Sequence, residues 1–168
     1  MNNVTLLLHD IRSVHNVGSI FRTAECLGVT KIVVSGVTPA PIDRFEKKRA
    51  DFAKVALGAE DMVPWEIITD AKEYIEAFKQ GRLSGMTEKG FVIVLEQDQK
   101  SVDYKKVEVP VNTPVLVVLG NEVSGAPQEH LNLANVIAEI PQAGLKESLN
   151  VSVAAAIVLF RWFDNRSV

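Results

Sequence analysis

The sequence predicts an α/β fold in which a parallel sheet carries helices on both faces. Apolar runs of strand length alternate along the chain with stretches of helical spacing, which is the pattern of such a sheet. Residues 91–95 and 115–119 are apolar at every position, as in central strands that are covered on both sides. A chain of 168 residues, 47% of them hydrophobic, is expected to form one domain over residues 1–168.

The individual elements follow from local patterns. Residues 14–27 have helical spacing, and Gly28 is a stop signal for that helix. Pro64 weakens the apolar run around it as a strand, because proline cannot donate a ladder hydrogen bond. The polar stretch 97–112 is expected to be a long surface connection. We predict strands at residues 4–9, 31–35, 62–68, 91–95, 115–119 and 136–140, and helices at residues 14–27, 45–57, 71–79, 127–133 and 148–163.

The last predicted helix is apolar on nearly every side, from Leu149 to Phe163. A helix of this kind must be covered all round. Cover from a second copy of the chain predicts a homodimer, whereas burial within its own monomer is the alternative.

The composition and local patterns of the sequence indicate the cellular compartment of the protein. The longest apolar run, residues 153–160, is too short to span a bilayer, and the N-terminal residues show no signal pattern. The single Cys26 cannot form an internal disulfide, and its apolar helical surroundings predict a core position. We therefore expect a cytoplasmic protein in a reducing compartment, with no membrane contact.

Several familiar ligand motifs are missing from the sequence. It contains neither the Gly-x-Gly-x-x-Gly dinucleotide fingerprint nor a Gly-x-x-x-x-Gly-Lys-Ser/Thr phosphate loop. His9, His15 and His130 have no Cys partners at metal-binding spacing, so no metal site is expected. Ser148 lacks the Gly-x-Ser-x-Gly context of a hydrolase nucleophile.

A basic segment offers a possible surface for nucleic acid. The formal net charge of −3 argues against a protein that binds nucleic acid over its whole surface, but a local patch is sufficient for RNA. Arg44, Lys47, Lys48, Arg49 and Lys54 crowd one stretch, diluted by acidic residues. Taken alone, this stretch is also consistent with a solvated helix face carrying mixed ion pairs.

The first of three short motifs is Asn16-Val17-Gly18-Ser19-Ile20-Phe21-Arg22-Thr23-Ala24. Asn16 and Gly18 are expected to open a helix, where free backbone N–H groups attract anions. The guanidinium of Arg22 can reach back toward the start of this helix and bind a phosphate there. The alternative is that Asn16 caps the helix and Arg22 is a surface charge.

The second motif, Leu119-Gly120-Asn121-Glu122, follows a buried strand. Gly120 allows a ligand or another backbone segment to come close. Glu122 is costly to bury without partners, and a nearby Arg could supply one. The alternative is a plain turn with a solvated Glu122.

The third motif runs from Ile140-Pro141 through Gly144 to Ser148-Leu149-Asn150-Val151-Ser152-Val153. Ser148 is a good N-cap for the last helix, and Asn150 in its first turn can point an amide into the mouth of a site. A capping serine beside an uninvolved asparagine fits the same residues.

Together and in this order, the three motifs resemble the SpoU-type (TrmH-like) RNA ribose 2′-O-methyltransferases of the SPOUT class. The resemblance extends roughly from Leu6 to Phe163. It implies a deep trefoil knot, in which the C-terminal segment threads through a preceding loop. Nothing in the periodicity of the chain indicates a knot, and knots are nearly absent from proteins.

The resemblance also implies a cofactor and a division of roles. S-adenosylmethionine would be held by the knot loops, lined here by Leu95, Leu119, Gly120, Asn121, Ile140, Ser148 and Leu149. Arg22 matches the family's catalytic arginine, which faces cofactor held by the other subunit of a dimer. Binding the adjacent phosphate and polarising the ribose hydroxyl is a physically easier role for it than that of a base, because a guanidinium is very hard to deprotonate. Asn16, Glu122, Ser148 and Asn150 would orient Arg22 and the ribose.

The chain resembles minimal family members that must recognise RNA with the catalytic domain alone. The segment containing Arg44, Lys47, Lys48 and Arg49, with Arg12, is then the expected RNA surface. We expect transfer RNA as the substrate, with ribosomal RNA as the second choice. A non-catalytic RNA-binding protein of the same fold is a further alternative. The sequence departs from the family pattern at Val123, where glycine is usual, and at Gln142, where methionine is common.

Overall fold

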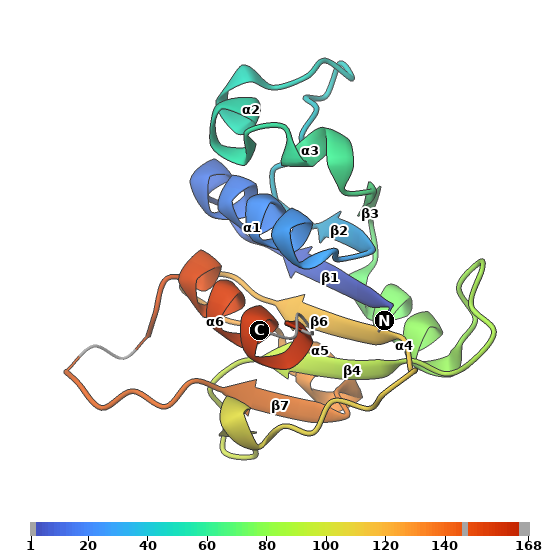
Figure 1. Cartoon of the computed structure of the whole chain (residues 1–168), viewed down its shortest axis with the longest axis vertical. Helices are drawn as coiled ribbons and strands as arrows, with labels where there is room; N and C mark the ends of the chain where they lie inside the picture. Colours follow the sequence, from blue (N-terminus) through green and yellow to red (C-terminus); the bar gives the residue numbers. More distant parts are fainter. Residues whose placement is uncertain (1–2, 146–147, 165–168) are drawn as a thin grey trace.

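The computed structural model describes residues 3–145 and 148–164. These residues form a seven-stranded sheet in the order β3-β2-β1-β6-β4-β7-β5, and every pairing within it is parallel (Figure 1). The carboxyl ends of parallel strands meet at one edge, so the loops that follow the strands gather there. The strands are β1 (Val4–His9), β2 (Lys31–Ser35), β3 (Trp65–Ile68), β4 (Phe91–Leu95), β5 (Val102–Asp103), β6 (Val115–Leu119) and β7 (Val136–Glu139).

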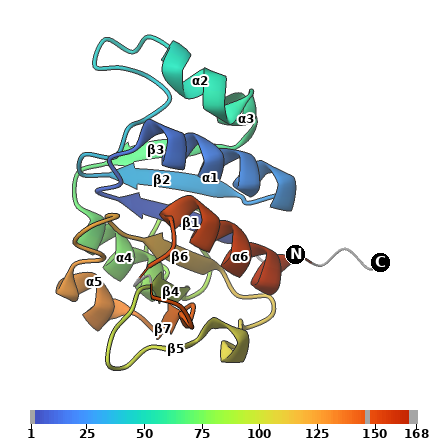
Figure 2. The same ribbon diagram turned by 90° about the vertical axis from the view of Figure 1, so that its left-hand side faces the viewer.

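Helices cover both faces of the sheet, as the sequence predicts (Figure 2). Within the described residues, one buried cluster joins α1, α2, α3 and α6 to one face of the strands, and another joins α4 and α5 to the opposite face. Successive residues of β1 point to opposite faces, so Leu6 and Leu8 lie in the first cluster and Leu7 in the second. The helices are α1 (Val14–Leu27), α2 (Ala50–Ala56), α3 (Ala59–Met62), α4 (Ala71–Gln80), α5 (Gln128–Leu133) and α6 (Val151–Phe163), with a 3₁₀ turn η1 (Tyr104–Lys106).

The predicted α1 is confirmed in full, and Gly28 caps its end in the left-handed conformation. Its core face carries Val17, Ile20, Phe21 and Ala24. Cys26 is exposed, so its predicted core position is wrong. Two residues turn a helix by about 200°, which places Cys26 on the side opposite Ala24.

Other boundaries differ from the sequence prediction. The predicted helix 45–57 exists only as α2, because a turn occupies its first residues and Glu46 has a left-handed φ of 61°. The predicted strand 62–68 begins only at Trp65, after the short helix α3. The predicted surface connection 97–112 contains β5 and η1.

The implied trefoil knot stays a prediction. No helix among the described residues is long and apolar enough to cross a membrane. No group of three or more His, Cys, Asp or Glu side chains in this part of the chain is placed to hold a metal ion.

Candidate active site

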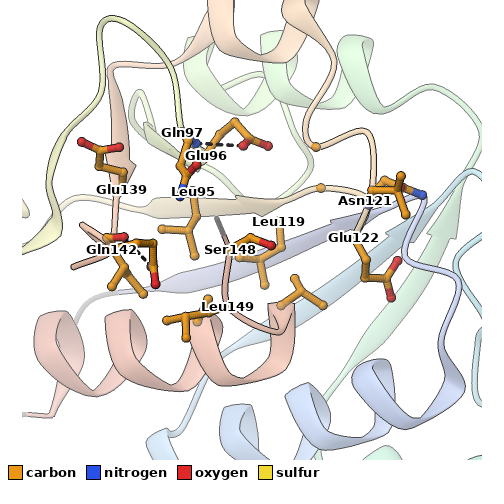
Figure 3. Close-up of a pocket in the computed structure, with 16 residues that line it drawn as sticks. Leu95, Glu96, Gln97, Leu119, Asn121, Glu122, Glu139, Gln142, Ser148 and Leu149 are labelled. Atoms are coloured by element: carbon orange, nitrogen blue, oxygen red, sulfur yellow. Dashed lines mark hydrogen bonds between the residues drawn. The ribbon is translucent and has the colours of Figure 1, made fainter. Parts of the chain in front are cut away.

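A pocket of about 300 Å³ opens at the carboxyl edge of the sheet, beyond β4, β6 and β7 (Figure 3). The start of α6 closes it on one side. All seven residues named from the sequence as cofactor-binding line this pocket: Leu95, Leu119, Gly120, Asn121, Ile140, Ser148 and Leu149. Their convergence from three separate stretches of chain is a finding of the structure, whereas their contact with a ligand stays a prediction.

Gly120 lets two backbone segments approach closely beside the pocket. A Cβ at this position would lie 2.5 Å from the backbone nitrogen of Ala126, a distance that real Cβ atoms do not show. The sequence prediction of a close approach at Gly120 is therefore confirmed, and the neighbour is the chain's own backbone. Gly125, in the same turn, has a left-handed φ of 70°.

A chain of hydrogen bonds links three predicted catalytic residues from distant parts of the sequence. The Asn16 amide donates to Glu122 Oε1 at 2.8 Å, and the Asn150 amide donates to Asn16 Oδ1 at 2.9 Å. Asn150 Oδ1 in turn accepts from the backbone N–H of Ser152 at 2.9 Å. Each amide is thus bonded through both its oxygen and its nitrogen, which fixes the orientation of Asn16 and Asn150.

The Glu122 carboxylate is held by donors from the loop that precedes α1. It accepts the backbone N–H of Arg12 at 3.1 Å and of Ser13 at 3.4 Å, in addition to the Asn16 amide. Partial burial raises the pKa of Glu122, but these hydrogen bonds outweigh burial and hold the pKa below its ordinary value. The sequence suggested an arginine side chain as the partner, and the structure supplies the Arg12 backbone instead.

The helix caps differ from those predicted. Ser13, and not Asn16, is the N-cap of α1, and its side chain accepts from the Asn16 N–H. Asn150, and not Ser148, is the N-cap of α6, so the predicted helix start at residue 148 is wrong. Capping requires a side-chain oxygen at the residue just before the first turn, and both serine and asparagine supply one. The cap therefore fixes Asn150 Oδ1 and leaves its amide hydrogens for Asn16.

Arg22 stands apart from this network. It is exposed on α1, and its side chain makes no hydrogen bond or ion pair with any residue that the structure describes. Six residues separate it from Asn16, which corresponds to about 9 Å along the helix and about 120° around it. The expectation that Arg22 reaches the same opening as Asn16 stays a prediction.

Two carboxylates of the pocket were missed from the sequence. Glu96 follows β4 and accepts the backbone N–H of Ala126 at 2.7 Å, and Glu139 ends β7. With Glu122, they give the described lining three carboxylates. The available signal was the one that identified Glu122, namely an acidic residue at or shortly after the end of an apolar strand.

The two departures from the family pattern lie at the pocket without disturbing its backbone. Val123 is 91% exposed, and it is not among the described residues with positive φ, so this position does not require glycine. Gln142 donates to the backbone oxygen of Ile140 at 2.7 Å. Both residues line the pocket.

The predicted RNA-binding cations differ in how they are paired. Lys48 contacts Asp61 at 2.7 Å, and Arg49 contacts Asp51 at 2.7 Å. The idea of mixed ion pairs is therefore right for these two residues, although they precede α2 and do not form a helix face. Arg44 and Lys47 are exposed and have no ion-pair partner among the described residues. Arg12 is also exposed, beside the site.

These features define an α/β protein whose ligand pocket lies beyond the carboxyl ends of parallel strands. The chain belongs to the SpoU rRNA Methylase family, whose model matches residues 3–160. The predicted resemblance, the parallel α/β fold and S-adenosylmethionine as the cofactor are confirmed at the level of this family.

Individual relatives match over nearly the whole chain. The chain is 31% identical over 163 residues to the 23S rRNA (guanosine-2′-O-)-methyltransferase RlmB of Ralstonia nicotianae, covering 97% of this chain and 59% of the relative. It is 32% identical over 163 residues to RlmB of Nitrosomonas europaea, with coverages of 96% and 56%. A crystal structure of an AdoMet-bound rRNA methyltransferase from Sinorhizobium meliloti superposes with a TM-score of 0.79 at 27% identity, covering 96% of this chain and 57% of that one. The chain thus spans less than three fifths of the length of these relatives.

Proposed function

We propose that this chain methylates a ribose 2′-hydroxyl in structured RNA, using S-adenosylmethionine, as a single SPOUT domain over residues 1–168. The observation that carries the proposal is the Glu122–Asn16–Asn150 hydrogen-bond chain at the rim of the pocket. It joins all three motifs of the family at one place. Transfer RNA is the proposed substrate. Ribosomal RNA is the second candidate, favoured by the rRNA named in the matched relatives.

The pocket suits the proposed cofactor in both shape and charge. Leu95, Leu119, Ile140 and Leu149 offer apolar contact for an adenine ring. The lining carboxylates, Glu122 among them, complement a cation in a site that is partly shielded from water. S-adenosylmethionine supplies an electrophilic methyl group carried on a positively charged sulfur.

The chain's own residues would act mainly by positioning. Asn16 and Asn150 have fixed amides, and we propose that they and Ser148 orient the ribose at the rim of the pocket. Holding a nucleophile in line with the group it attacks supplies a large part of the rate in such displacements. Arg22 would bind the phosphate beside the target ribose and polarise its hydroxyl, a role that needs no deprotonated guanidinium.

We further propose a homodimer in which the site is shared. The apolar residues Val153 and Phe160 of α6 are 48% and 39% exposed, and seven residues, or two helical turns, place them on one side. Helix α6 also packs on α1, which carries Arg22. A second copy covering this side of α6 would bring an Arg22 toward each pocket. Expected partners are therefore RNA and a second copy, in the cytoplasm.

The proposed RNA surface consists of Arg12, Arg44, Lys47, Lys48 and Arg49. Arg12 lies directly beside the Glu122 network. The other four lie in the loop that leaves β2 at the same edge of the sheet. A local patch of this kind allows an acidic protein to bind RNA.

The test is methyl transfer from labelled S-adenosylmethionine to unfractionated tRNA and rRNA, read out by nucleoside mass spectrometry. We expect a 2′-O-methylated nucleoside that disappears with Arg22→Ala. Cofactor binding without transfer to either pool would contradict the proposed substrates. Absence of cofactor binding as well would favour the non-catalytic RNA-binding alternative.

A further inference from the structure

The loop that carries the basic residues is an ordered projection. Ile42 and Lys48 form an antiparallel bridge, the Asp43 N–H donates to the Lys47 oxygen at 2.8 Å, and the Arg49 N–H donates to the Pro41 oxygen at 2.9 Å. Figure 2 shows this loop extending beyond β2 next to α2. Residues 44–46 form its tip.

Local hydrogen bonds fix the tip. The Asp43 carboxylate accepts the backbone N–H of Phe45 at 2.8 Å and of Lys47 at 3.0 Å, which is a side-chain-closed turn. Glu46 takes the left-handed conformation that this turn requires. Little further ordering of the backbone is needed when a partner binds here.

The tip presents an aromatic ring to solvent. Phe45 is 65% exposed and belongs to neither buried cluster. The guanidinium of Arg44 lies 4.8 Å from the centre of its ring. Packing of this chain does not account for a phenyl group held at the tip of an ordered turn.

The ring lies between two cations that can bind phosphate; of the acidic neighbours Asp43 and Glu46, Asp43 is engaged by backbone N–H groups. Arg44 and Lys47 flank Phe45 without ion pairs among the described residues, whereas Lys48 is bound to Asp61 and Arg49 to Asp51. Unpaired cations beside an exposed aromatic ring are the combination that binds single-stranded nucleic acid, through phosphates and through a stacked base. A fully paired duplex offers no free base face to such a ring.

The tip is connected to the candidate site through Asp10. Its carboxylate accepts the backbone N–H of Val37 at the start of the loop, at 2.9 Å. Its backbone oxygen accepts from the Asn121 amide, at 2.7 Å. Loop and pocket thus rise from the same edge of the sheet, and an RNA strand held at one can extend to the other.

We propose that Phe45 is a stacking platform for an unpaired base of the RNA substrate, with Arg44 and Lys47 binding the adjacent phosphates. This inference rests on the proposed function and deepens it, because it restricts the substrate to RNA with an unpaired nucleotide near the methylated ribose.

The experiment compares wild type, Phe45→Ala, Phe45→Trp and Val111→Ala in binding to unfractionated tRNA, rRNA and a fully paired RNA duplex. Val111 is the matched control, because it is an apolar residue in the connection before β6 that is 78% exposed, compared with 65% for Phe45. We expect Phe45→Ala to weaken binding to whichever natural RNA the wild type prefers by about tenfold, within the range for base–aromatic stacking. We expect Phe45→Trp and Val111→Ala to retain the affinity, and all four proteins to bind the duplex equally.

Several results would overturn the inference. They are unchanged affinity of Phe45→Ala, an equal loss on the duplex, no binding of tRNA or rRNA by the wild type, or a changed sedimentation coefficient of RNA-free Phe45→Ala, which would indicate a protein contact. The proposed function is tested separately by methyl transfer. Loss of binding by Phe45→Ala in a protein that transfers no methyl group would support this inference and contradict the function.

Discussion

Four of the five predicted catalytic residues fall into two groups that the chain holds very differently. Glu122, Asn16 and Asn150 are locked together by hydrogen bonds from both sides of the pocket rim. Arg22 is exposed on the next turns of α1, and its side chain makes no hydrogen bond or ion pair with the described residues. One chain thus fixes Glu122, Asn16 and Asn150 at the pocket rim and leaves Arg22 exposed.

This difference teaches how a small domain can divide an active site. Preorganised groups need partners within the fold, because an unsatisfied carboxylate or amide is costly. A guanidinium that must meet a phosphate is better left exposed until the phosphate arrives. In the proposed homodimer, a second copy would cover the exposed side of α6.

The largest expected effect is that of Arg22→Ala on methyl transfer. We expect kcat to fall by about 10²- to 10³-fold, as when one stabilising donor is removed from an enzyme site. The affinity for S-adenosylmethionine should stay within about twofold, because Arg22 does not line the pocket of its own chain and its proposed contact is with the RNA phosphate. Single-turnover kinetics and calorimetric cofactor binding would check the two values. A large loss of cofactor affinity would contradict the separation of the two groups.

A smaller loss is expected for Asn150→Asp. Aspartate keeps the capping oxygen that α6 requires, but it removes the amide donor that binds Asn16. We expect about a tenfold fall in kcat with little change in thermal stability, consistent with loss of one hydrogen bond. Asn132→Asp is a matched control, since Asn132 is exposed on α5 away from the pocket rim. Equal activity of wild type and Asn150→Asp would show that the Asn16 contact is not used.

Much of this contrast could not be predicted from the sequence. The strands β1, β2, β4 and β6 were predicted with their observed bounds, because continuous apolar runs have few other interpretations. The motifs identified the pocket residues but not their partners. Whether Glu122 meets an arginine side chain or the Arg12 backbone depends on contacts between residues more than 100 positions apart.

The basic segment is a second place where the structure could not be predicted from the sequence. Its composition is typical of a helix, yet Asp43 closes a turn with its own side chain, and that local hydrogen bonding competes with helix formation. The ion pairs that distinguish Lys48 and Arg49 from Arg44 and Lys47 depend on this turn.

The buried side chain of His130 is a third case, because one of its ring nitrogens lacks a hydrogen-bond partner among the described residues. His130 is 1% exposed, and its Nδ1 has no partner among the described residues. Burial, reinforced by His9, lowers the pKa of His130 to about 4. The unfolded state therefore binds a proton at higher pH than the folded state does, so the stabilising effect is complete above about pH 6.5 and is lost as the pH falls toward 4.

We expect the contribution of His130 to lower the free energy of unfolding by about 1 kcal/mol between pH 7 and pH 5.5. His130→Leu should reduce that slope, whereas His15→Gln, at an exposed position, should not. Urea unfolding at several pH values would measure this. If the free energy of unfolding of His130→Leu fell with pH as steeply as that of the wild type, the assignment of this pH dependence to His130 would be contradicted.

The smallest expected effect compares a paired with an unpaired lysine in the loop that carries the basic residues, between β2 and α2. Lys47→Ala should weaken RNA binding about threefold and reduce the salt dependence by about one ion, because Lys47 is free to bind a phosphate. Lys48→Ala should change both values less, because Lys48 is bound to Asp61. Binding titrations over a range of salt concentrations would compare them. Equal effects of Lys47→Ala and Lys48→Ala would contradict the predicted difference between an unpaired and a paired lysine.

The shared site is tested most directly by combining two impaired chains in one dimer. Arg22→Ala and Asn150→Asp chains carrying different tags would be co-expressed, and heterodimers would be isolated through both tags. One of the two sites in each heterodimer then combines an intact pocket with an intact arginine, so we predict about half of the wild-type activity. Heterodimers no more active than the average of the two variant homodimers, or a wild-type protein that sediments as a monomer, would contradict the account.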